Sequence, residues 1–400
     1  MRQRPSSTGW PRPRERRRYD VTFYVPWITG LLRPGAAPPP GGAETQIYLL
    51  AQALAARGVR PCLIAYETVD AHLPPSIEGV GVVFRRRHNT HRRVLGRIGE
   101  VLFIWHSLIR APADTVVSRT AGPYIGIVAA FAKLTRRRFV YSSANVVDFN
   151  VQRLESKRRN LALFNGGARL ADQVVVQTEE QVEMCRQRFS RSPVLIKSLA
   201  EPAQQRNAEP EAFLWIGRLV SYKQPLEYVE LARAVPEARF WMVGVPAPSF
   251  GGERLVAEVR AAADGVPNLE LLAPLARPRL MELIDRSVAV VNTADFEGMP
   301  NIFLEGWTRG VPALGLSHDP NGVIVRHKLG GFAGGSPGRL AELAREAWAG
   351  RHDQVDVAER CRRYIELEHS PEAVAERWVR VLGFGPTAPF PEARTDAEAT

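Results

Sequence analysis

The sequence predicts an α/β protein made of two doubly wound domains, each built on a parallel sheet. Its 400 residues are too many for one ordinary core and suit two domains of roughly 150–200 residues each. Short apolar runs alternate with helical patterns of roughly 10–15 residues, the order expected of parallel βαβ units. The alternation stops once, at Leu199–Glu211, a stretch rich in Pro, Gln, Ala and Asn that is typical of a linker.

In the first half, the Pro- and Arg-rich residues 1–19 lack periodicity and are expected to form a flexible basic arm. Apolar runs predict strands at Val21–Pro26, Val59–Tyr66, Val80–Arg85, Thr115–Ser118, Arg138–Ser142 and Gln173–Gln177. Helical patterns predict helices at Ala43–Arg57, Ile98–Ile109 and Tyr124–Leu134. Another helix is expected to begin after Thr178, with Thr178 as its N-cap and Gln181 completing a capping box.

The second half repeats the alternation. Strands are expected at Phe213–Gly217, Arg239–Gly244, Asn268–Ala273, Val288–Asn292 and, last, Pro312–Leu316. Helices are expected at Pro225–Ala234, Glu253–Ala263, Arg277–Asp285 and Asn301–Arg309. The remainder of the chain, from the last strand to Leu382, is expected to be helical. Ser370 followed by Pro371 is typical of a helix start.

These elements predict the domain organisation. An N-terminal domain spans 20–199 and a C-terminal domain 200–369. A helix at 370–383 packs back on the N-terminal domain, and a loose tail spans 384–400.

Composition indicates a globular protein of a reducing, cytoplasmic compartment. Hydrophobic residues make up 45% of the chain and charged residues 24%. No apolar run reaches the roughly 18 residues that a membrane-spanning helix needs, and the Arg-rich start lacks the apolar stretch of a secretory signal. The three cysteines are far apart in sequence and form no metal-binding spacing.

The net charge of +11 is unevenly distributed. Residues 1–200 contain 31 Lys and Arg against 14 Asp and Glu, whereas residues 201–400 contain 22 against 28. A basic half of this kind is attracted to an anionic surface, either lipid headgroups or nucleic acid. A solvated, Arg-rich surface explains the same counts equally well.

The strongest functional signal is the stretch from Phe296 to Glu305. A predicted strand ends in a polar turn containing Gly298 and Pro300, and a helix begins near Asn301. Backbone N–H groups at such a helix start face the crevice at the carboxyl end of the strand. Glu297 in the loop and Glu305 about one turn inside the helix can accept hydrogen bonds from two parts of one polyhydroxylated ligand.

A second signal places positive charge at the end of another strand. Phe213–Gly217 is expected to end in a tight turn at Gly217, followed by Arg218 and Lys223 five residues apart. Cations beside a helix start suit a diphosphate whose charge grows as it leaves. In the first half, Gly41 and Gly42 open a helix, where two glycines let the backbone come close to a phosphate or a sugar.

The two carboxylates with their Gly-x-Pro turn, and the Gly-Arg-(x)4-Lys pattern before them, resemble the retaining GT-B glycosyltransferases of family 4. The resemblance covers residues 20–382 and is strongest from 213 to 316. It implies two facing Rossmann-like domains with a cleft between them, and a nucleotide sugar as donor. Gly41-Gly42-Ala43-Glu44 is similar to the family's Gly-Gly-x-Glu loop, which lines the cleft near the acceptor and the diphosphate.

The resemblance also implies roles for individual residues. Arg218 and Lys223 would hold the leaving diphosphate, Glu297 would approach the donor sugar, and Glu305 would bind the ribose. With the backbone between the two carboxylates, the expected donor-binding residues are Gly217, Arg218, Lys223, Glu297, Gly298, Met299, Pro300, Asn301 and Glu305. In the family, the acceptor hydroxyl attacks the anomeric carbon from the same face as the one from which the diphosphate leaves. A phosphate oxygen helps to deprotonate that hydroxyl, so no separate base is expected.

The acceptor side departs from the family pattern. Many members have a histidine soon after the strand that corresponds to Phe139–Ser142, and this sequence continues Ser-Ser-Ala-Asn instead. Asn145 or Asp148 could recognise the acceptor, and equally both could be loop residues. Arg119, at the end of another predicted strand, is placed in the same way.

Several other functions lack their motifs. The sequence contains no P-loop and no Gly-x-Gly-x-x-Gly. Gly334–Gly338 fits the Gly-x-Ser-x-Gly pattern of a hydrolase nucleophile elbow, but the residues before it do not predict the buried strand that such an elbow follows. Ser336 is better interpreted as an N-cap before Pro337. Without an Asp-x-Asp, no metal and no cofactor are expected.

The predicted function is therefore retaining, metal-independent transfer of a sugar to a glycan or lipid-linked acceptor. The basic half would contact an anionic membrane at its inner face, and no nucleic acid is expected as a partner. Two alternatives stay open: a nucleotide-sugar epimerase of the same fold, and a nucleic-acid-binding or scaffolding protein.

Overall fold

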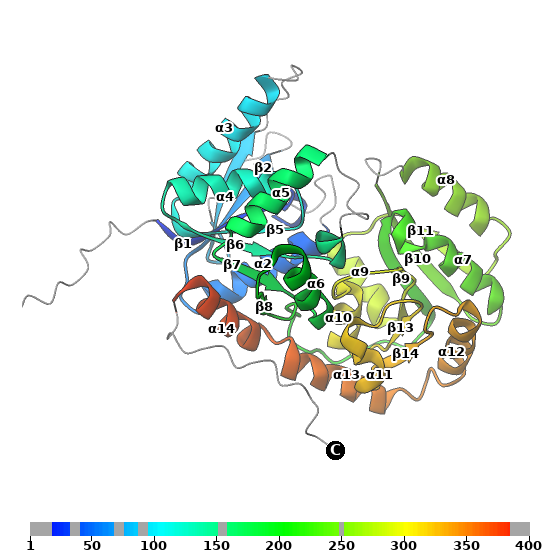
Figure 1. Ribbon diagram of the computed structural model, residues 1–400. Coiled ribbons are helices and arrows are strands. Elements are labelled where there is room, and N and C mark those ends of the chain that lie inside the picture. The colour runs from blue at the N-terminus through cyan, green and yellow to red at the C-terminus, as the bar shows by residue number, and fades with distance from the viewer. Residues whose placement is uncertain are drawn as a thin grey trace, which may run out of the picture.

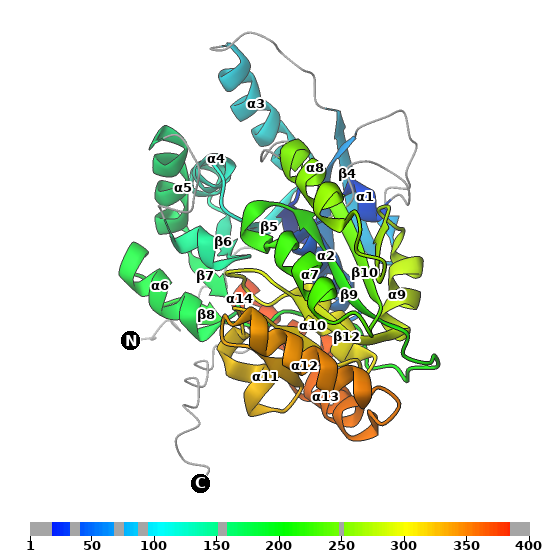
Figure 2. The same cartoon turned by 90° about the vertical axis from the view of Figure 1, so that its right-hand side faces the viewer.

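The computed structural model describes residues 18–32, 41–67, 76–86, 95–150, 158–247 and 252–384. These residues form two α/β domains side by side (Figures 1 and 2). Nearly all of the predicted basic arm and of the predicted tail lies outside the described residues. Among the described residues, no helix has both the length and the apolar character needed to span a membrane.

The N-terminal domain is built on an eight-stranded sheet in the order β3-β4-β2-β1-β5-β6-β7-β8. All pairs in it are parallel except the antiparallel pair of β3 and β4. The strands are β1 (Tyr19–Tyr24), β2 (Pro61–Glu67), β3 (Ser76–Ile77), β4 (Val80–Arg86), β5 (Ala113–Arg119), β6 (Arg138–Ser142), β7 (Gln173–Val176) and β8 (Val194–Leu195). The chain order reverses between β1 and β5, which makes this point the topological switch of the sheet.

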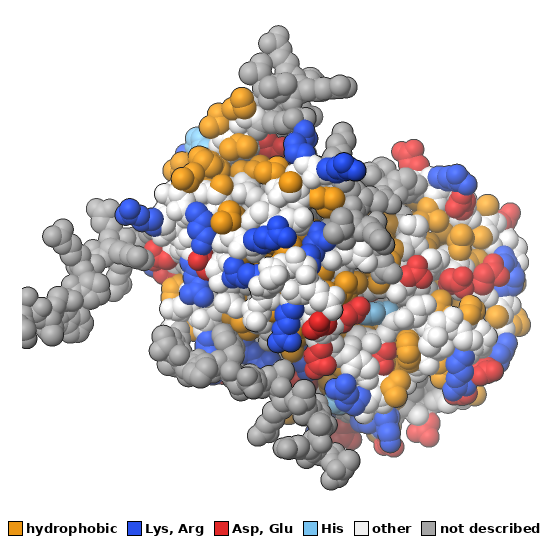
Figure 3. Space-filling model, in the orientation of Figure 1, with side chains coloured by type: hydrophobic (Ala, Val, Ile, Leu, Met, Phe, Trp, Pro, Cys, Tyr) orange, Lys and Arg blue, Asp and Glu red, His pale blue; other side chains and the backbone are white. Residues whose placement is uncertain are grey.

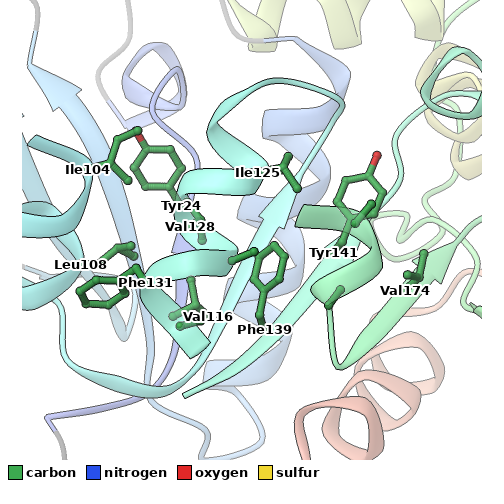
Figure 4. Packing of buried hydrophobic residues seen from close by; sticks show 14 of the residues in the cluster. Tyr24, Ile104, Leu108, Val116, Ile125, Val128, Phe131, Phe139, Tyr141 and Val174 are labelled. Carbon is green, nitrogen blue, oxygen red and sulfur yellow. The ribbon is translucent and has the colours of Figure 1, made fainter. Parts of the chain in front are cut away.

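Helices cover both faces of this sheet. They are α1 (Thr29–Leu32), α2 (Gly42–Ala55), α3 (Leu95–Arg110), α4 (Tyr124–Leu134), α5 (Arg158–Leu170) and α6 (Glu179–Phe189), with a 3-10 helix η1 (Val146–Phe149). One core cluster lies under α3, α4 and α5 and contains Ile104, Leu108, Phe131, Phe139 and Phe164 (Figure 4). The other face of the sheet packs against α2. Apolar residues on both faces explain why the strands are continuous hydrophobic runs.

The C-terminal domain has a six-stranded parallel sheet in the order β11-β10-β9-β12-β13-β14. Its strands are β9 (Ala212–Leu219), β10 (Phe240–Pro246), β11 (Leu269–Leu272), β12 (Ser287–Asn292), β13 (Ala313–Gly315) and β14 (Gly330–Phe332). Helices α7 (Pro225–Ala234), α8 (Gly252–Ala263) and α12 (Pro337–Ala349) pack on one face. Helices α9 (Arg277–Asp285), α10 (Asn301–Thr308), α11 (Val323–Arg326) and α13 (Val355–Glu368) pack on the other.

The last helix returns to the N-terminal domain. Helix α14 (Pro371–Leu382) lies beside α2, and its Val374, Trp378 and Leu382 belong to the core on that side of the N-terminal sheet (Figure 1). Ser370 caps α14 by accepting a hydrogen bond from the Ala373 N–H at 3.3 Å. The same kind of cap starts α12, where the Ser336 hydroxyl accepts from the Arg339 N–H, so Ser336 is an N-cap as predicted.

Two predictions about local structure away from the candidate site were wrong. The chain after residue 316 is not wholly helical, because β14 adds a parallel strand beside β13. The two glycines that begin β14 disfavour a strand by propensity. Glycine is nevertheless needed here for close contact with β13, because a Cβ on Gly330 would lie 1.9 Å from the Ala313 carbonyl oxygen. Thr178 caps α6 as predicted, but the Gln181 side chain accepts from the Gln177 N–H instead of closing a capping box on Thr178.

A buried histidine connects the end of α13 to the segment that links the domains. The His369 Nδ1–H donates to the Ser198 carbonyl at 2.6 Å, and the Ala200 N–H donates to the His369 carbonyl. His369 is fully buried, and this burial lowers its pKa to about 4.

This histidine should make stability depend on pH. In the unfolded chain a histidine has a pKa of about 6.5, so between these values the unfolded chain binds more protons than the folded one. The contribution is therefore complete above about pH 6.5 and is lost as the pH falls toward 4; from pH 7 to pH 5 we expect a loss of roughly 2 kcal/mol. Urea unfolding of wild type, His369→Gln and the exposed His352→Gln at both pH values measures it. Equal losses in all three proteins would contradict this role.

Candidate functional site

The candidate site lies where the switch points of the two sheets face each other. In the C-terminal domain the chain order reverses between β9 and β12, and Arg218 and Glu297 lie at or just beyond the carboxyl ends of these strands. In the N-terminal domain, Arg119 ends β5 and Gly41 precedes α2. Ligands of open α/β sheets bind at such points.

Lys223 and Glu297 form an ion pair at the centre of this region. Only 19% of the Lys223 side chain and 10% of the Glu297 side chain are exposed. Burial, and after it the positive charge of Arg218, lowers the pKa of Lys223, while the carboxylate in contact favours its charged form. The sequence placed both residues in the site; their direct contact depends on how two separate loops meet.

The turn after β9 differs from the prediction. The strand continues through Gly217 to Leu219, so there is no tight turn at Gly217. The chain turns instead in a 3-10 helix, Ser221–Lys223, and then at Gln224, which has a φ of +47°. Arg218 is exposed at the end of the strand, and its guanidinium donates to the Tyr222 hydroxyl at 3.4 Å.

The loop that carries Glu297 is held from two sides. The Asp295 N–H donates to the Tyr222 carbonyl at 3.0 Å, and the rings of Tyr222 and Phe296 stack with centroids 5.0 Å apart. The His318 Nε2–H donates to the Gly298 carbonyl at 2.9 Å, and burial lowers the pKa of His318. His318 thus supports the site loop directly.

Helix α10 begins just after this loop. Pro300 is its N-cap, and no side chain caps the helix start. Uncapped N–H groups at a helix N-terminus favour an anionic group in front of them. Met299 is buried beneath the loop, so this residue supports the loop through apolar packing.

Glu305 lies in α10 and forms an ion pair with a residue that the sequence analysis did not identify. Arg277, at the first position of α9, donates to the Glu305 carboxylate at 2.8 Å and to Glu201 at 2.9 Å. Burial raises the pKa of Glu305, and Arg277 opposes part of that increase. The only signal in the sequence was an Arg before a Pro at a helix start, which gives no indication of its partner.

The Gly41–Gly42 loop contacts the C-terminal domain. The Asn301 side-chain amide donates to the Gly42 carbonyl at 2.9 Å and accepts from the Gln46 side chain at 3.2 Å. A Cβ on Gly42 would lie 2.6 Å from the Asn301 Nδ2 atom. Glycine at 42 therefore lets the backbone of α2 approach the start of α10.

Asn145 reaches Glu297 across the domain boundary. Its Nδ2 donates to the Glu297 carboxylate at 3.3 Å, while its Oδ1 accepts from the Val147 N–H and caps η1. Asn145 is therefore in the site and shares Glu297 with Lys223.

Asp148, the other candidate in this loop, has a different position. It is buried and accepts hydrogen bonds from the Tyr141 and Ser143 hydroxyls and from the Ala144 N–H. With its acceptor capacity used inside the protein, Asp148 orders the loop instead of reaching into the crevice. Arg119 is also buried and donates to the Ser142 hydroxyl at 3.1 Å.

A substitution at Gly298 tests whether the Glu297 loop must lie close to the N-terminal domain. A Cβ there would lie 2.9 Å from the Ala144 carbonyl oxygen and 3.3 Å from the Gln181 side-chain amide. We expect Gly298→Ala to displace the Glu297 loop and lower turnover about 10- to 100-fold, since small misplacements of reacting groups are costly. Gly166→Ala, which meets nothing within 4 Å, is the control. Steady-state kinetics with full turnover for Gly298→Ala would refute this view of the contact.

In charge, the site combines three cations, Arg218, Lys223 and Arg277, with the carboxylates of Glu297, Glu305 and Glu201. This set can hold a diphosphate at one end and hydroxyl groups at the other. Among the described residues, no group of three or more His, Cys, Asp or Glu side chains is placed to hold a metal ion.

Comparison with known proteins agrees with this arrangement. Residues 41–200 match the family described as "Glycosyl transferase 4-like domain". A stretch of 115 residues is 25% identical to glycosyltransferase 1 domain-containing protein 1 of Xenopus tropicalis. That stretch covers 29% of this chain and 33% of the length of the curated relative.

Solved structures resemble the whole fold. Sucrose-phosphate synthase from Thermosynechococcus elongatus has a TM-score of 0.70 at 13% identity, over 91% of this chain and 98% of that one. HepE of Anabaena, in complex with UDP-glucose, has a TM-score of 0.70 at 15% identity, over 91% and 99%. WaaG, a glycosyltransferase involved in lipopolysaccharide biosynthesis, has a TM-score of 0.64 at 18% identity, over 91% and 100%.

The predicted fold class is confirmed: two parallel-sheet α/β domains in the GT-B arrangement. The match at residues 41–200 and the shared fold are similarities to glycosyltransferases.

Proposed function

We propose that this protein transfers a sugar from a nucleoside diphosphate sugar to an acceptor hydroxyl with retention of anomeric configuration. The observation that carries the proposal is the buried Lys223–Glu297 ion pair, with Arg218 beside it and Glu305 in the helix that follows. Arg218 and Lys223 suit the diphosphate of such a donor, and the carboxylates of Glu297 and Glu305 suit its hydroxyl groups.

The cations would bind the diphosphate. Arg218 is exposed at the end of β9, and Lys223 lies close enough for the Arg218 charge to lower its pKa. A bound diphosphate would replace Glu297 as the negatively charged partner of Lys223. The Glu297 carboxylate would then be free to accept hydrogen bonds from the sugar. That HepE was solved with UDP-glucose supports a nucleotide sugar as the ligand class.

Glu305 would bind the ribose of the donor. Its ion pair with Arg277 favours the charged form of the carboxylate and opposes the burial that raises its pKa. An ionised carboxylate accepts two hydroxyl hydrogen bonds, which is what a ribose offers. Arg277 therefore acts as a positioning residue for Glu305.

We propose the following chemical step. The bond between the anomeric carbon and the diphosphate oxygen breaks, and Arg218 and Lys223 stabilise the charge that develops on the leaving group. The acceptor oxygen bonds to the anomeric carbon on the same face, and its proton passes to a diphosphate oxygen. The products are the glycosylated acceptor and the nucleoside diphosphate. Because two protein cations stabilise the leaving group, we propose that the reaction needs no metal.

The acceptor would enter from the N-terminal domain. Asn145 lies against Glu297, so it would lie next to the place where the acceptor meets the donor sugar, with Arg119 buried behind it at the end of β5. A glycan or a lipid-linked acceptor is the class that we propose.

The experiment has two stages. A panel of nucleotide sugars is screened for thermal stabilisation, because a ligand that binds only the folded state raises its stability. Nucleoside diphosphate release is then measured with EDTA and acceptor mixtures, and the anomeric configuration of the product is read by NMR. Transfer with retention in EDTA is expected. Inversion, loss of transfer in EDTA, or conversion of the donor without an acceptor would each contradict the proposal.

A further inference from the structure

Helix α3 has an exposed apolar face that the proposed reaction does not use. It extends outward from the N-terminal domain in both views (Figures 1 and 2). Ile98, Leu102 and Ile109 are 57%, 60% and 61% exposed. With the half-buried Trp105 their spacing is four, three and four residues, which places all of them on one side of a helix.

An adjacent side of α3 fills the core. Ile104 and Leu108 are buried in the cluster under α3, α4 and α5. A surface helix normally has polar residues facing solvent, so this helix is unusual in being apolar on two sides. Contiguous exposed apolar residues of this kind mark an interaction surface.

The neighbouring helices extend the surface and make it basic. Leu134 at the end of α4 is 71% exposed, and Leu163 in α5 is 40% exposed. Together α3, α4 and α5 contain six Lys or Arg and one acidic residue, Glu100. Figure 3 shows hydrophobic side chains over α3 and α4, with Lys and Arg side chains over α4 and α5.

Several of these cations form no ion pair with the carboxylates that the structure describes. Lys133 is paired with Asp172. Among the residues that the structure describes, no ion pair involves Arg110, Arg158 or Arg159, and all three are exposed. Their charge is therefore available to an anionic partner.

We propose that the outer surface of α3, α4 and α5 docks this protein on an anionic lipid membrane. An apolar row on a helix inserts at the boundary between headgroups and acyl chains, and flanking cations bind the anionic headgroups. Nucleic acid would use the cations and leave the apolar row exposed to water. A second copy of the chain would bring two basic surfaces together. A membrane is the partner that satisfies both features.

The test needs neither donor nor acceptor, so it is independent of the proposed reaction. The full chain is sedimented with vesicles of phosphatidylcholine alone and of phosphatidylcholine mixed with phosphatidylglycerol. We expect binding to the mixed vesicles that salt weakens. The triple variant Ile98→Gln/Leu102→Gln/Ile109→Gln should bind the mixed vesicles at least about tenfold more weakly than the wild type, because its apolar row is lost.

The matched control replaces three equally exposed apolar residues of the C-terminal domain, as Val325→Gln/Val355→Gln/Leu367→Gln; their exposed fractions are 62%, 72% and 66%. This control should bind vesicles like the wild type, and thermal unfolding checks that both triple variants are folded. Equal vesicle binding by the two triple variants would overturn the proposal. So would absence of wild-type binding, or an α3-dependent dimer detected by size-exclusion chromatography.

Discussion

Replacing Lys223 with alanine is expected to lower the turnover of sugar transfer about 100- to 1,000-fold, the cost of removing one group that stabilises charge in a transition state. Lys223 lies, mostly but not fully buried, at the turn after β9 and contacts Glu297. Its removal takes one of two cations from the leaving group and leaves the Glu297 carboxylate buried without its partner. Steady-state kinetics at saturating donor measures the effect.

A stability measurement and a control variant separate catalysis from structure. If Lys223 only held the Glu297 loop in place, Lys223→Ala would lower thermal stability together with turnover; the proposed role predicts low turnover in a protein that is still folded at the assay temperature. Arg339→Ala removes an exposed cation of α12 paired with Glu342 and should leave turnover unchanged. Wild-type turnover in Lys223→Ala would contradict the assignment of this residue to the leaving group.

Replacing Trp307 with alanine is expected to lower the free energy of unfolding by about 3–5 kcal/mol. Trp307 is fully buried in α10, two residues after Glu305, and its ring lies 5.5 Å from that of Tyr364 in α13. Its indole N–H donates to the Leu329 carbonyl at 3.2 Å. Truncation leaves a cavity under the helix that carries Glu305, so donor affinity should fall as well.

Urea unfolding measures the loss, and two variants provide the comparison. Trp307→Phe keeps most of the ring and should lose less stability. Trp27→Ala removes a side chain that is 47% exposed, and its effect should be the smallest of the three. A loss below about 1 kcal/mol in Trp307→Ala, the range of surface substitutions, would show that α10 is not held by this contact.

The sequence predicted the elements best where a helix has its own start and stop signals. The bounds of α4, α7 and α9 agree with the prediction, and α7 and α9 each have a proline in their first turn. The strand β14 was missed because its glycines are required by contact with β13, and that contact is not visible in local sequence. The two-residue strands β3 and β8 are too short to show a period.

For the site, the sequence identified residue types at strand ends but not their partners. Glu297 and Lys223 were recognisable from their motifs, since each follows a strand of the C-terminal domain. Contacts of Glu297 with Asn145, and of Glu305 with Arg277, depend on how separate loops pack. The turn at Gly217 was wrongly predicted because glycine permits a turn without requiring one.

The central claim is that Arg218, Lys223 and Glu305 bind one nucleoside diphosphate sugar. Calorimetric titration with a panel of nucleoside diphosphates and their sugar conjugates tests it most directly. We expect at least one ligand to bind the wild type and Arg339→Ala equally, and to bind Lys223→Ala and Glu305→Ala about tenfold more weakly, as loss of one charge-assisted contact predicts. If no ligand in the panel binds, or if the Lys223→Ala/Glu305→Ala double variant binds with wild-type affinity, the claim is wrong.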